Sequence, residues 1–185
     1  MTAKLYIIAG CSGVGKGTLI KEFLKRNNDI IFSISYTTRS PRPGEEDGVN
    51  YFFISKEEFE KMIKNDGFIE YAEFSGNYYG TGKEFVQKKL AKNQNILLEI
   101  EIQGCAQVKS KIPDAISIFI LPPSIEELEK RLRGRHTETE EVIQRRLAIA
   151  SKELEESKKF DYCVVNDNIE NALNELQKIF DSQKG

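Results

Sequence analysis

The chain opens with a short apolar run, LYIIA, that leads directly into a glycine-rich turn and then into an amphipathic segment. The run carries no charge, which predicts a strand buried on both faces. The following segment, GKGTLIKEFLKRN, places Leu19, Ile20, Phe23 and Leu24 on one face of a helix. A buried strand that leads into such a helix is typical of a parallel sheet, so this beginning already limits the fold class.

The same alternation continues along the chain. The segments IIFSIS, NILLEIE, AISIFIL and YCVVN predict further strands, and helical segments lie between most of them. Residues 36–81 differ, because turn residues, aromatic side chains and short alternating stretches predict a small insertion with antiparallel strands. One helix, KEEFEKMIKND, lies within the insertion, with Ser55 as its N-cap. The sequence therefore predicts an α/β fold with a three-layer core around a parallel sheet, an inserted mixed α/β lobe and a charged, mobile lid.

The length of 185 residues fits a single domain. We expect the core to comprise residues 1–35, 82–134 and 147–185, with the lobe at about 36–81 and the lid at about 135–146. The chain is 39% apolar and 30% charged, as in soluble globular proteins. Its net charge of −2 argues against nucleic acid as a partner.

Two further features concern the cellular compartment. The apolar run near the N-terminus is too short for a signal peptide, and no stretch approaches the ~20 apolar residues of a membrane span. The cysteines, Cys11, Cys105 and Cys163, are odd in number and form no C-x-x-C motif. Reduced thiols, no membrane partner and a cytoplasmic location are therefore predicted.

The glycine-rich turn matches the phosphate-binding loop pattern, with Gly10, Gly15 and Lys16 at the required spacing between a strand and a helix. Glycines let successive backbone N–H groups turn inward around phosphate oxygens, and the helix N-terminus adds partial positive charge. An ordinary glycine-rich turn would require neither this spacing nor the lysine. The predicted triphosphate-binding residues are Gly10, Cys11, Ser12, Gly13, Val14, Gly15, Lys16, Gly17 and Thr18.

One position departs from the common pattern of this loop. Gly17 follows the lysine, where a serine or threonine would bind magnesium through its hydroxyl. We therefore expect Mg²⁺ to enter with a nucleoside triphosphate and to be held mainly by its phosphates and by water. The GKGT variant resembles small nucleotide kinases more than switch-type GTPases.

Arginine is concentrated in two stretches, TTRSPRPG and KRLRGRHTETEEVIQRRL. The guanidinium fork binds phosphate oxygens through two parallel hydrogen bonds, so Arg39 and Arg42 in the first stretch suit a second anion. Tyr51 and Tyr79 add phenol donors within the same insertion. Ion pairs with neighbouring glutamates are the alternative for either stretch.

Motifs from end to end of the chain resemble those of guanylate kinases, a family of phosphate-loop nucleoside monophosphate kinases. The matching segments are GCSGVGKGTL, SISYTTRSPRPGEEDGVNYFF, FIEYAEFSGNYYGT, LLEIEIQG, IFILPPS, RLRGRHTETEEVIQRRL and YCVVND. The resemblance covers nearly all 185 residues. It implies transfer of the γ-phosphoryl group of ATP to GMP, and also to dGMP, in purine nucleotide metabolism and GMP recycling.

The resemblance also implies roles for individual residues. Lys16, Arg39, Arg131, Arg135 and Arg146 would act in catalysis, and Asn166 would lie near the adenine of ATP. The residues expected to bind GMP are Ser35, Arg39, Arg42, Glu45, Tyr51, Glu70, Tyr79, Thr81 and Glu101. Among them Arg39, Arg42, Tyr51 and Tyr79 would hold the phosphate, and Glu45 would orient the arginines.

Base chemistry supports this assignment. Guanine presents N–H donors at N1 and N2, which suit the carboxylates of Glu70 and Glu101, and acceptors at O6 and N7, which suit the hydroxyls of Ser35 and Thr81. Adenine presents a lone pair at N1, which a carboxylate would repel. Sites built on such hydrogen bonds discriminate by ~10⁴–10⁵, because the wrong base leaves buried polar groups unpaired.

Three residues depart from the family pattern. Cys11 stands where proline is usual in the loop, and its thiol is either an oxidation-sensitive group or an inert small side chain. Glu101 replaces the commoner aspartate of EIDxQG, which adds a methylene at the guanine or metal edge. His136 replaces a lid glycine, and we expect a solvent-exposed position for it rather than a catalytic role.

Two alternative functions compete with this one. Scaffold proteins carry guanylate-kinase-like domains that bind protein partners and lack catalysis, but these generally lack an intact glycine–lysine loop. A kinase for another nucleoside monophosphate is the second alternative, and the four guanine-facing side chains argue against it.

Overall fold

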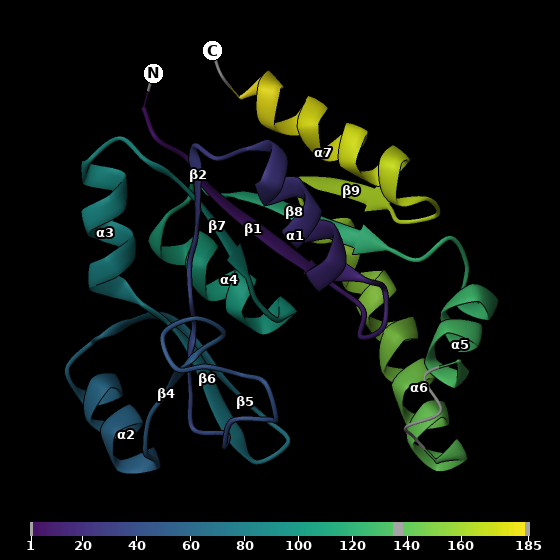
Figure 1. Cartoon of the computed structure of the whole chain (residues 1–185), viewed down its shortest axis with the longest axis horizontal. Coiled ribbons are helices and arrows are strands. Elements are labelled where there is room, and N and C mark those ends of the chain that lie inside the picture. Colours follow the sequence, from purple (N-terminus) through teal and green to yellow (C-terminus); the bar gives the residue numbers. More distant parts are fainter. Residues whose placement is uncertain (1, 135–138, 184–185) are drawn as a thin grey trace. The chain divides into compact units, whose positions relative to one another are not determined.

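The computed structural model describes residues 2–134 and 139–183, which form two compact units (Figure 1). One unit comprises residues 8–28 and the described part of 117–185, and the other comprises residues 2–7 and 29–116. Among the described residues, no helix combines the length and the apolar character needed to cross a bilayer.

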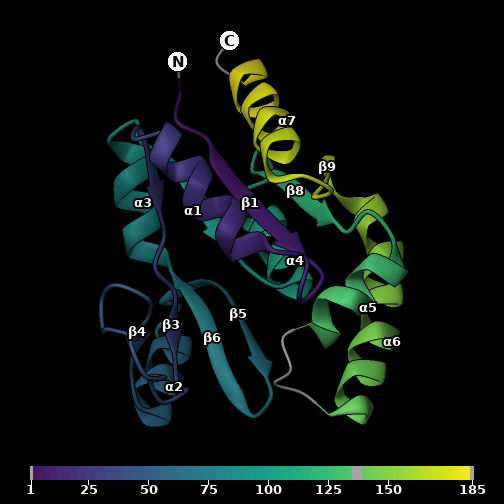
Figure 2. The same ribbon diagram turned by 45° about the vertical axis from the view of Figure 1, so that its right-hand side comes forward.

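In the first unit, helix α7 packs against strand β9. Helices α1 and α7 lie side by side in both views, and their Phe23 and Phe180 rings are 4.7 Å apart (Figures 1 and 2). Strands β8 and β9 pair in parallel, with Ile118 opposite Tyr162. The elements of this unit are α1 (Lys16–Arg26), β8 (Ile116–Leu121), α5 (Ile125–Arg133), α6 (Glu140–Glu156), a 3₁₀ turn (Ser157–Lys159), β9 (Tyr162–Val165) and α7 (Ile169–Ser182).

The second unit contains a parallel strand pair and the predicted insertion. Strands β2 and β7 pair in parallel, with Ile31 opposite Ile96. Helix α3 packs on β7 and β5, and α4 packs on β5. The elements are β2 (Ile30–Phe32), β3 (Tyr36–Thr37), β4 (Phe52–Phe53), α2 (Lys56–Lys64), β5 (Phe68–Phe74), β6 (Asn77–Gly82), α3 (Lys83–Ala91), β7 (Asn95–Glu99) and α4 (Ile102–Lys111).

Strand β1 (Leu5–Gly10) contributes residues to both units. The strand order of the five-stranded sheet is β2-β7-β1-β8-β9. Every residue of β1 is buried, as the uncharged run LYIIA predicts, and only the last residue of β8 is partly exposed. Strands buried on both faces are typical of parallel sheets covered by helices, and the predicted α/β class is confirmed.

The insertion has a sheet of its own, with strand order β4-β3-β6-β5 (Figure 2). Strand β6 pairs antiparallel with β5 and β3, whereas β4 adds to β3 in parallel. Helix α2 begins with the predicted cap, since the Ser55 side chain accepts a hydrogen bond from Glu58 N, and Glu58 reciprocates as a capping box. The buried Phe59 of α2 stacks on Phe68 and Tyr78, with ring centroids 4.3 and 5.3 Å away.

The predicted domain boundaries fall near these elements. Residues 36–81 take in β3, β4, α2, β5 and nearly all of β6. The predicted lid, 135–146, is described only from Thr139 onward, where it forms the beginning of α6. Arg135 and His136 lie outside the described residues, and the boundaries stay a prediction.

The three cysteines are thiols with different surroundings. Cys11 is fully buried, and its Sγ contacts the backbone oxygen of Ala150 at 3.9 Å. Burial, with a contribution from nearby Glu153, raises the pKa of the Cys11 thiol to about 12. Cys105 is buried and Cys163 is exposed. Of the two alternatives for Cys11, the structure favours an inert side chain, because the thiolate is the reactive form.

We therefore expect a disulfide-exchange reagent at about pH 8 to modify Cys163 rapidly in the native protein and to modify Cys11 and Cys105 only after unfolding. The absorbance of the released thiol would be followed before and after addition of denaturant. Cys163→Ser should remove the rapid phase alone. Rapid labelling of Cys11 in folded protein would contradict the burial of its thiol.

Candidate functional site

The turn between β1 and α1, predicted to be a phosphate-binding loop, contains glycines in conformations that favour glycine. Gly13 and Gly15 have φ values of 88° and 93°, in the left-handed region that favours glycine. Gly15 is also the N-cap of α1, and its carbonyl accepts a hydrogen bond from Leu19 N at 3.1 Å. A loop of this kind aims backbone N–H groups at an anion beside the positive end of a helix.

Lys16 folds back over this loop. Its Nζ donates hydrogen bonds to the carbonyl oxygens of Gly10 at 2.6 Å and Cys11 at 3.2 Å. The ammonium group is thus held by backbone oxygens next to the place where the loop would bind phosphate. Phosphate oxygens would replace these carbonyls with charged partners, which form stronger hydrogen bonds.

Two glycines of the loop leave room for side chains of other elements. A β-carbon at Gly13 would lie 2.8 Å from Leu132 Cδ2 of α5. A β-carbon at Gly15 would lie 2.8 Å from Asn166 Nδ2, and this amide donates to Val14 O at 2.8 Å. Asn166, the residue predicted to lie near adenine, is therefore fixed directly against the loop.

Two of the predicted catalytic arginines reach the same loop. Arg131 Nη1 donates to Asn166 O at 3.1 Å, and Arg146 Nη1 donates to Ser12 Oγ at 3.0 Å. The structure thus brings Arg131, Arg146 and Asn166 to the loop that carries Lys16. Arg135, the third arginine predicted for the lid, lies outside the described residues.

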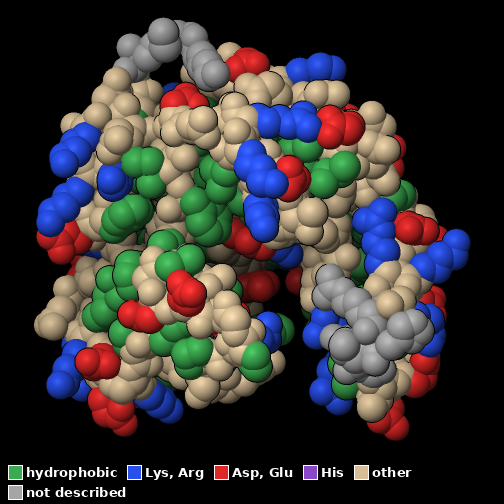
Figure 3. All heavy atoms as spheres, in the orientation of Figure 1, with side chains coloured by type: hydrophobic (Ala, Val, Ile, Leu, Met, Phe, Trp, Pro, Cys, Tyr) green, Lys and Arg blue, Asp and Glu red, His purple; other side chains and the backbone are tan. Residues whose placement is uncertain are grey.

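Arg133 of the same stretch has a different environment. It pairs with Glu129 at 2.7 Å and with Glu140, and this pairing lowers the pKa of Glu140 to about 2. Figure 3 shows basic and acidic side chains close together over α5 and α6. The ion-pair alternative therefore applies to Arg133, and Arg131 likewise pairs with Glu127 at 3.3 Å. In addition, Arg131 and Arg146 extend to the loop.

In the second unit, Arg39 and Glu45 form a two-point ion pair. Arg39 Nη1 and Nη2 donate to Glu45 Oε2 and Oε1, both at 2.9 Å, and the two side chains are 14% and 18% exposed. Glu45 Oε2 also accepts from Arg42 N at 2.7 Å. These hydrogen bonds, first that of Arg39, lower the pKa of Glu45. Glu45 thus joins the side chain of Arg39 to the backbone of Arg42.

The two predicted tyrosines lie beside this pair. The guanidinium carbon of Arg39 is 5.4 Å from the centroid of the Tyr51 ring, which lies 6.1 Å from the Tyr79 ring. Burial, and next the charge of Glu99, raises the pKa of Tyr51. Tyr51 therefore keeps its proton and can donate a hydrogen bond to an anion.

Glu70 and Thr81 face each other across β5 and β6. They are paired in register, both are at least 96% buried, and Thr81 Oγ1 donates to Glu70 Oε1 at 2.6 Å. The register shifts between Phe68 and Glu70, an irregularity of the kind that re-aims a side chain. Burial has the largest effect on the pKa of Glu70 and raises it. The charge of Glu101 has a smaller effect in the same direction.

The other residues predicted to bind GMP include Ser35, Glu101 and Arg42, which lie outside the regular helices and strands. Glu101 is the N-cap residue of α4, and its side chain is exposed. Ser35 lies between β2 and β3, where its carbonyl accepts from Phe52 N at 2.9 Å. The Arg42 side chain is exposed. Ser35, Glu101 and Arg42 are thus more accessible to solvent than the buried pair of Glu70 and Thr81.

The described residues hold no group of three or more histidine, cysteine, aspartate or glutamate side chains arranged to bind a metal ion. A β-carbon at Gly17 would meet no atom within 4 Å, and Thr18 is exposed.

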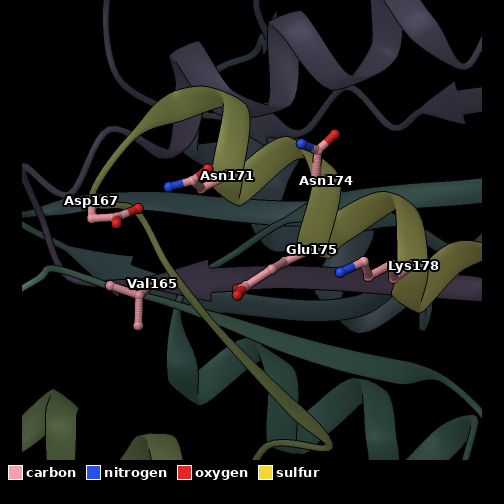
Figure 4. Close-up of a pocket in the computed structure, with 6 residues that line it drawn as sticks. All are labelled: Val165, Asp167, Asn171, Asn174, Glu175 and Lys178. Carbon is pink, nitrogen blue, oxygen red and sulfur yellow. The ribbon is translucent and has the colours of Figure 1, made fainter.

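A pocket of about 300 Å³ lies between the end of β9 and helix α7 (Figure 4). None of the predicted site residues lines it. The lining residues Asn171, Asn174, Glu175 and Lys178 project from α7, Val165 ends β9, and Asp167 lies between β9 and the helix (Figure 4). Its lining is polar and mostly exposed, so we assign it no part in the site.

Sequence reasoning missed two residues next to the predicted group. Glu99 influences the pKa of Tyr51, and the alternation in the segment EIE places it two residues before Glu101 at the end of β7. Gly104 lies against the carboxylate of Glu70. A glycine inside the helical segment GCAQVKSK was the available signal.

Comparisons with known proteins identify the family of this chain. A family model described as guanylate kinase matches residues 2–183. The guanylate kinase of Prochlorococcus marinus subsp. pastoris is 53% identical over 179 residues, which cover 97% of each chain. That of Clostridioides difficile is 49% identical over 180 residues, covering 97% of this chain and 88% of its own.

Comparison with solved structures also finds a guanylate kinase. The crystal structure of guanylate kinase from Anaplasma phagocytophilum superposes with a TM-score of 0.82 at 30% identity, covering 99% of this chain and 87% of that chain. Shikimate kinase from Bacteroides thetaiotaomicron, with a TM-score of 0.51 at 14% identity, shares the fold alone. Because the family model spans nearly the whole chain and relatives match it over almost their full length, this chain belongs to the guanylate kinase family.

Proposed function

We propose that this chain is an enzyme that transfers the γ-phosphoryl group of ATP to GMP, and also to dGMP, giving ADP and the nucleoside diphosphate. Membership of the guanylate kinase family supports this reaction. The observation that carries the choice of acceptor is the buried carboxylate of Glu70, because a phosphate-binding loop alone selects no acceptor. This proposal places the enzyme in purine nucleotide metabolism and in the recycling of GMP.

The first unit would bind ATP. Lys16 would exchange the carbonyls of Gly10 and Cys11 for oxygens of the β- and γ-phosphates, while the loop amides surround the remaining oxygens. Asn166, fixed to Val14 O, would lie near the adenine. The loop residues proposed to bind ATP are Gly10, Cys11, Ser12, Gly13, Val14, Gly15, Lys16, Gly17 and Thr18.

Arg131 and Arg146 would stabilise the charge that develops during transfer. Both already contact residues of the ATP-binding loop or its neighbour Asn166. Arginines in this position contribute ~10³–10⁵ to the rate of phosphoryl transfer. Arg135 is proposed for the same role on the family resemblance alone.

Mg²⁺ would enter with ATP, held mainly by phosphate oxygens and water. The open surface around Gly17 and Thr18 leaves room for such a hydrated ion. When bound, the ion neutralises phosphate charge and so reduces the repulsion between the two anionic substrates.

The second unit would bind the acceptor. Arg39 and Arg42, with the phenols of Tyr51 and Tyr79, would hold the GMP phosphate. Glu45 would keep the Arg39 guanidinium in place before GMP arrives, because it holds both terminal nitrogens. Prior ordering lowers the entropy cost of binding.

Glu70 and Glu101 would accept hydrogen bonds from guanine N1 and N2, and Ser35 and Thr81 would face its acceptors. In the protein described here the Thr81 hydroxyl donates to Glu70, so it would have to rotate to donate to guanine. Before guanine binds, Thr81 therefore holds the carboxylate of Glu70 in place.

The reaction requires no protein nucleophile. An oxygen of the GMP phosphate would attack the γ-phosphorus, the new O–P bond would form, and the bond to the β,γ-bridging oxygen would break as ADP leaves. The protein supplies position and positive charge, which are its main contributions to phosphoryl transfer.

A cytoplasmic location, expected from the reduced thiols, stays a prediction.

The test is ADP formation with ATP and Mg²⁺ when GMP, dGMP, AMP, UMP, CMP and dTMP are offered separately. We expect strong turnover with GMP and dGMP alone. Turnover confined to another base would show a different nucleotide kinase. No turnover with any acceptor, in protein that is folded by circular dichroism, would favour the protein-binding alternative.

Replacing Lys16 tests the ATP-binding loop. Lys16→Ala should lower kcat about 100-fold or more, because a charge aimed at the transferring phosphates is lost. Lys21→Ala is the matched control, since Lys21 lies on the same helix with an exposed side chain. Near-normal turnover in a folded Lys16→Ala variant would refute the role of Lys16.

Replacing Glu70 tests base recognition. Glu70→Gln preserves shape but exchanges one acceptor oxygen for a donor, so the preference for GMP over AMP, measured as the ratio of kcat/KM values, should fall about 10-fold to 100-fold. Glu73→Gln alters an exposed carboxylate of the same strand and should leave the ratio unchanged. An unchanged ratio in Glu70→Gln would mean that Glu70 does not recognise the base.

A further inference from the structure

Helix α4 is joined to strand β5 by side chains that take the place of a neighbouring strand. Strand β5 is at the edge of the four-stranded sheet, so one side of its backbone lacks a strand partner. The Gln107 side chain fills part of that side, because its Nε2 donates to Tyr71 O at 2.8 Å and its Oε1 accepts from Tyr71 N at 3.2 Å. Lys111 Nζ donates to Phe68 O at 3.0 Å.

These contacts fix α4 against the residues on either side of Glu70. Gln107 holds the residue after Glu70, and Lys111 holds the residue two positions before it. The helical spacing then brings Gly104, one turn before Gln107, to the Glu70 side chain. A β-carbon at Gly104 would clash with Glu70 Oε2 and would lie only 3.0 Å from Glu70 Cδ.

No backbone requirement explains a glycine at this position. Gly104 lies in the first turn of α4 and is not among the glycines with positive φ. Glycine within a helix is less favourable than alanine by about 1 kcal/mol. The glycine therefore lowers helix stability, and what it provides in return is space for the Glu70 carboxylate.

We propose that Gly104 is a positioning residue for base selection, because its missing side chain lets the Glu70 carboxylate lie against the first turn of α4, at a separation fixed by Gln107. The inference rests on the proposed function, in which Glu70 recognises guanine. Thr81 holds one oxygen of this carboxylate, and Gly104 leaves room for the other.

Gly104→Ala should displace the carboxylate and leave guanine N–H donors without an acceptor. We expect the KM for GMP to rise about 10-fold to 100-fold, with a fall in the preference for GMP over AMP. The KM for ATP should not change. The melting temperature should stay the same or rise, because alanine favours the helix. A merely structural role would instead lower stability and leave base preference intact.

A double-mutant cycle shows whether the effect passes through Glu70. In a Glu70→Ala background no carboxylate meets the new β-carbon, so Gly104→Ala should change the KM for GMP less than twofold. Ser110→Ala, an exposed position on the same helix, is the control and should change neither KM. An equal rise in the KM for GMP in both backgrounds would overturn the inference.

Gln107→Glu provides a second variant if Gly104→Ala does not fold. Its carboxylate cannot donate to Tyr71 O, so the link between α4 and β5 should weaken and the preference for GMP over AMP should fall. An unchanged preference in Gln107→Glu would contradict the part assigned to this link.

The outcomes separate the inference from the proposed function. If Glu70→Ala leaves the KM for GMP unchanged, base recognition by Glu70 is wrong and the inference fails with it. If Glu70→Ala raises that KM but Gly104→Ala does not, the proposed function stands and the inference about Gly104 alone is wrong.

Discussion

Close approach at glycine is the constraint on which both groups of functional residues depend. A β-carbon at Gly15 would collide with the Asn166 amide, and one at Gly104 would collide with the Glu70 carboxylate. A β-carbon at Gly10 would likewise collide with the carbonyl oxygen of Ile120, at a distance of 2.6 Å. At each place a missing side chain lets a polar group of another element lie directly against the backbone. Core side chains pack around these contacts, but the room for each polar group comes from the missing side chain of the glycine.

Two cations of the site, Lys16 and Arg39, have partners within the protein itself. Lys16 is held by two backbone carbonyls, and Arg39 is held by both oxygens of Glu45. Each cation is therefore ordered before a ligand arrives. For Lys16, phosphate would exchange neutral partners for charged ones, which favours binding. For Arg39, phosphate would compete with a carboxylate, or would add to it through the remaining N–H groups of the guanidinium.

Much of this arrangement could be predicted from the sequence, because its patterns are local. The spacing of Gly10, Gly15 and Lys16 requires only neighbouring residues to define a loop, and the cap of α2 at Ser55 likewise depends on a residue three positions away. In the second arginine-rich stretch, by contrast, the local sequence does not predict which contacts each arginine makes. Nothing local distinguishes Arg131, which reaches Asn166 O, from Arg133, which pairs with Glu129 and Glu140. Helix packing decides which arginine faces the loop.

The sequence by itself determined the α/β class and predicted the phosphate-binding loop. Both follow from periodicity and glycine spacing, which act over a few neighbouring residues, whereas the residues expected to bind guanine came from the family resemblance. Only the tertiary structure decided that Thr81 donates to Glu70, that Glu99 acts on Tyr51 and that Gly104 makes room for a carboxylate. Each joins different secondary-structure elements, and such contacts depend on strand register and helix packing, which no short stretch of sequence specifies.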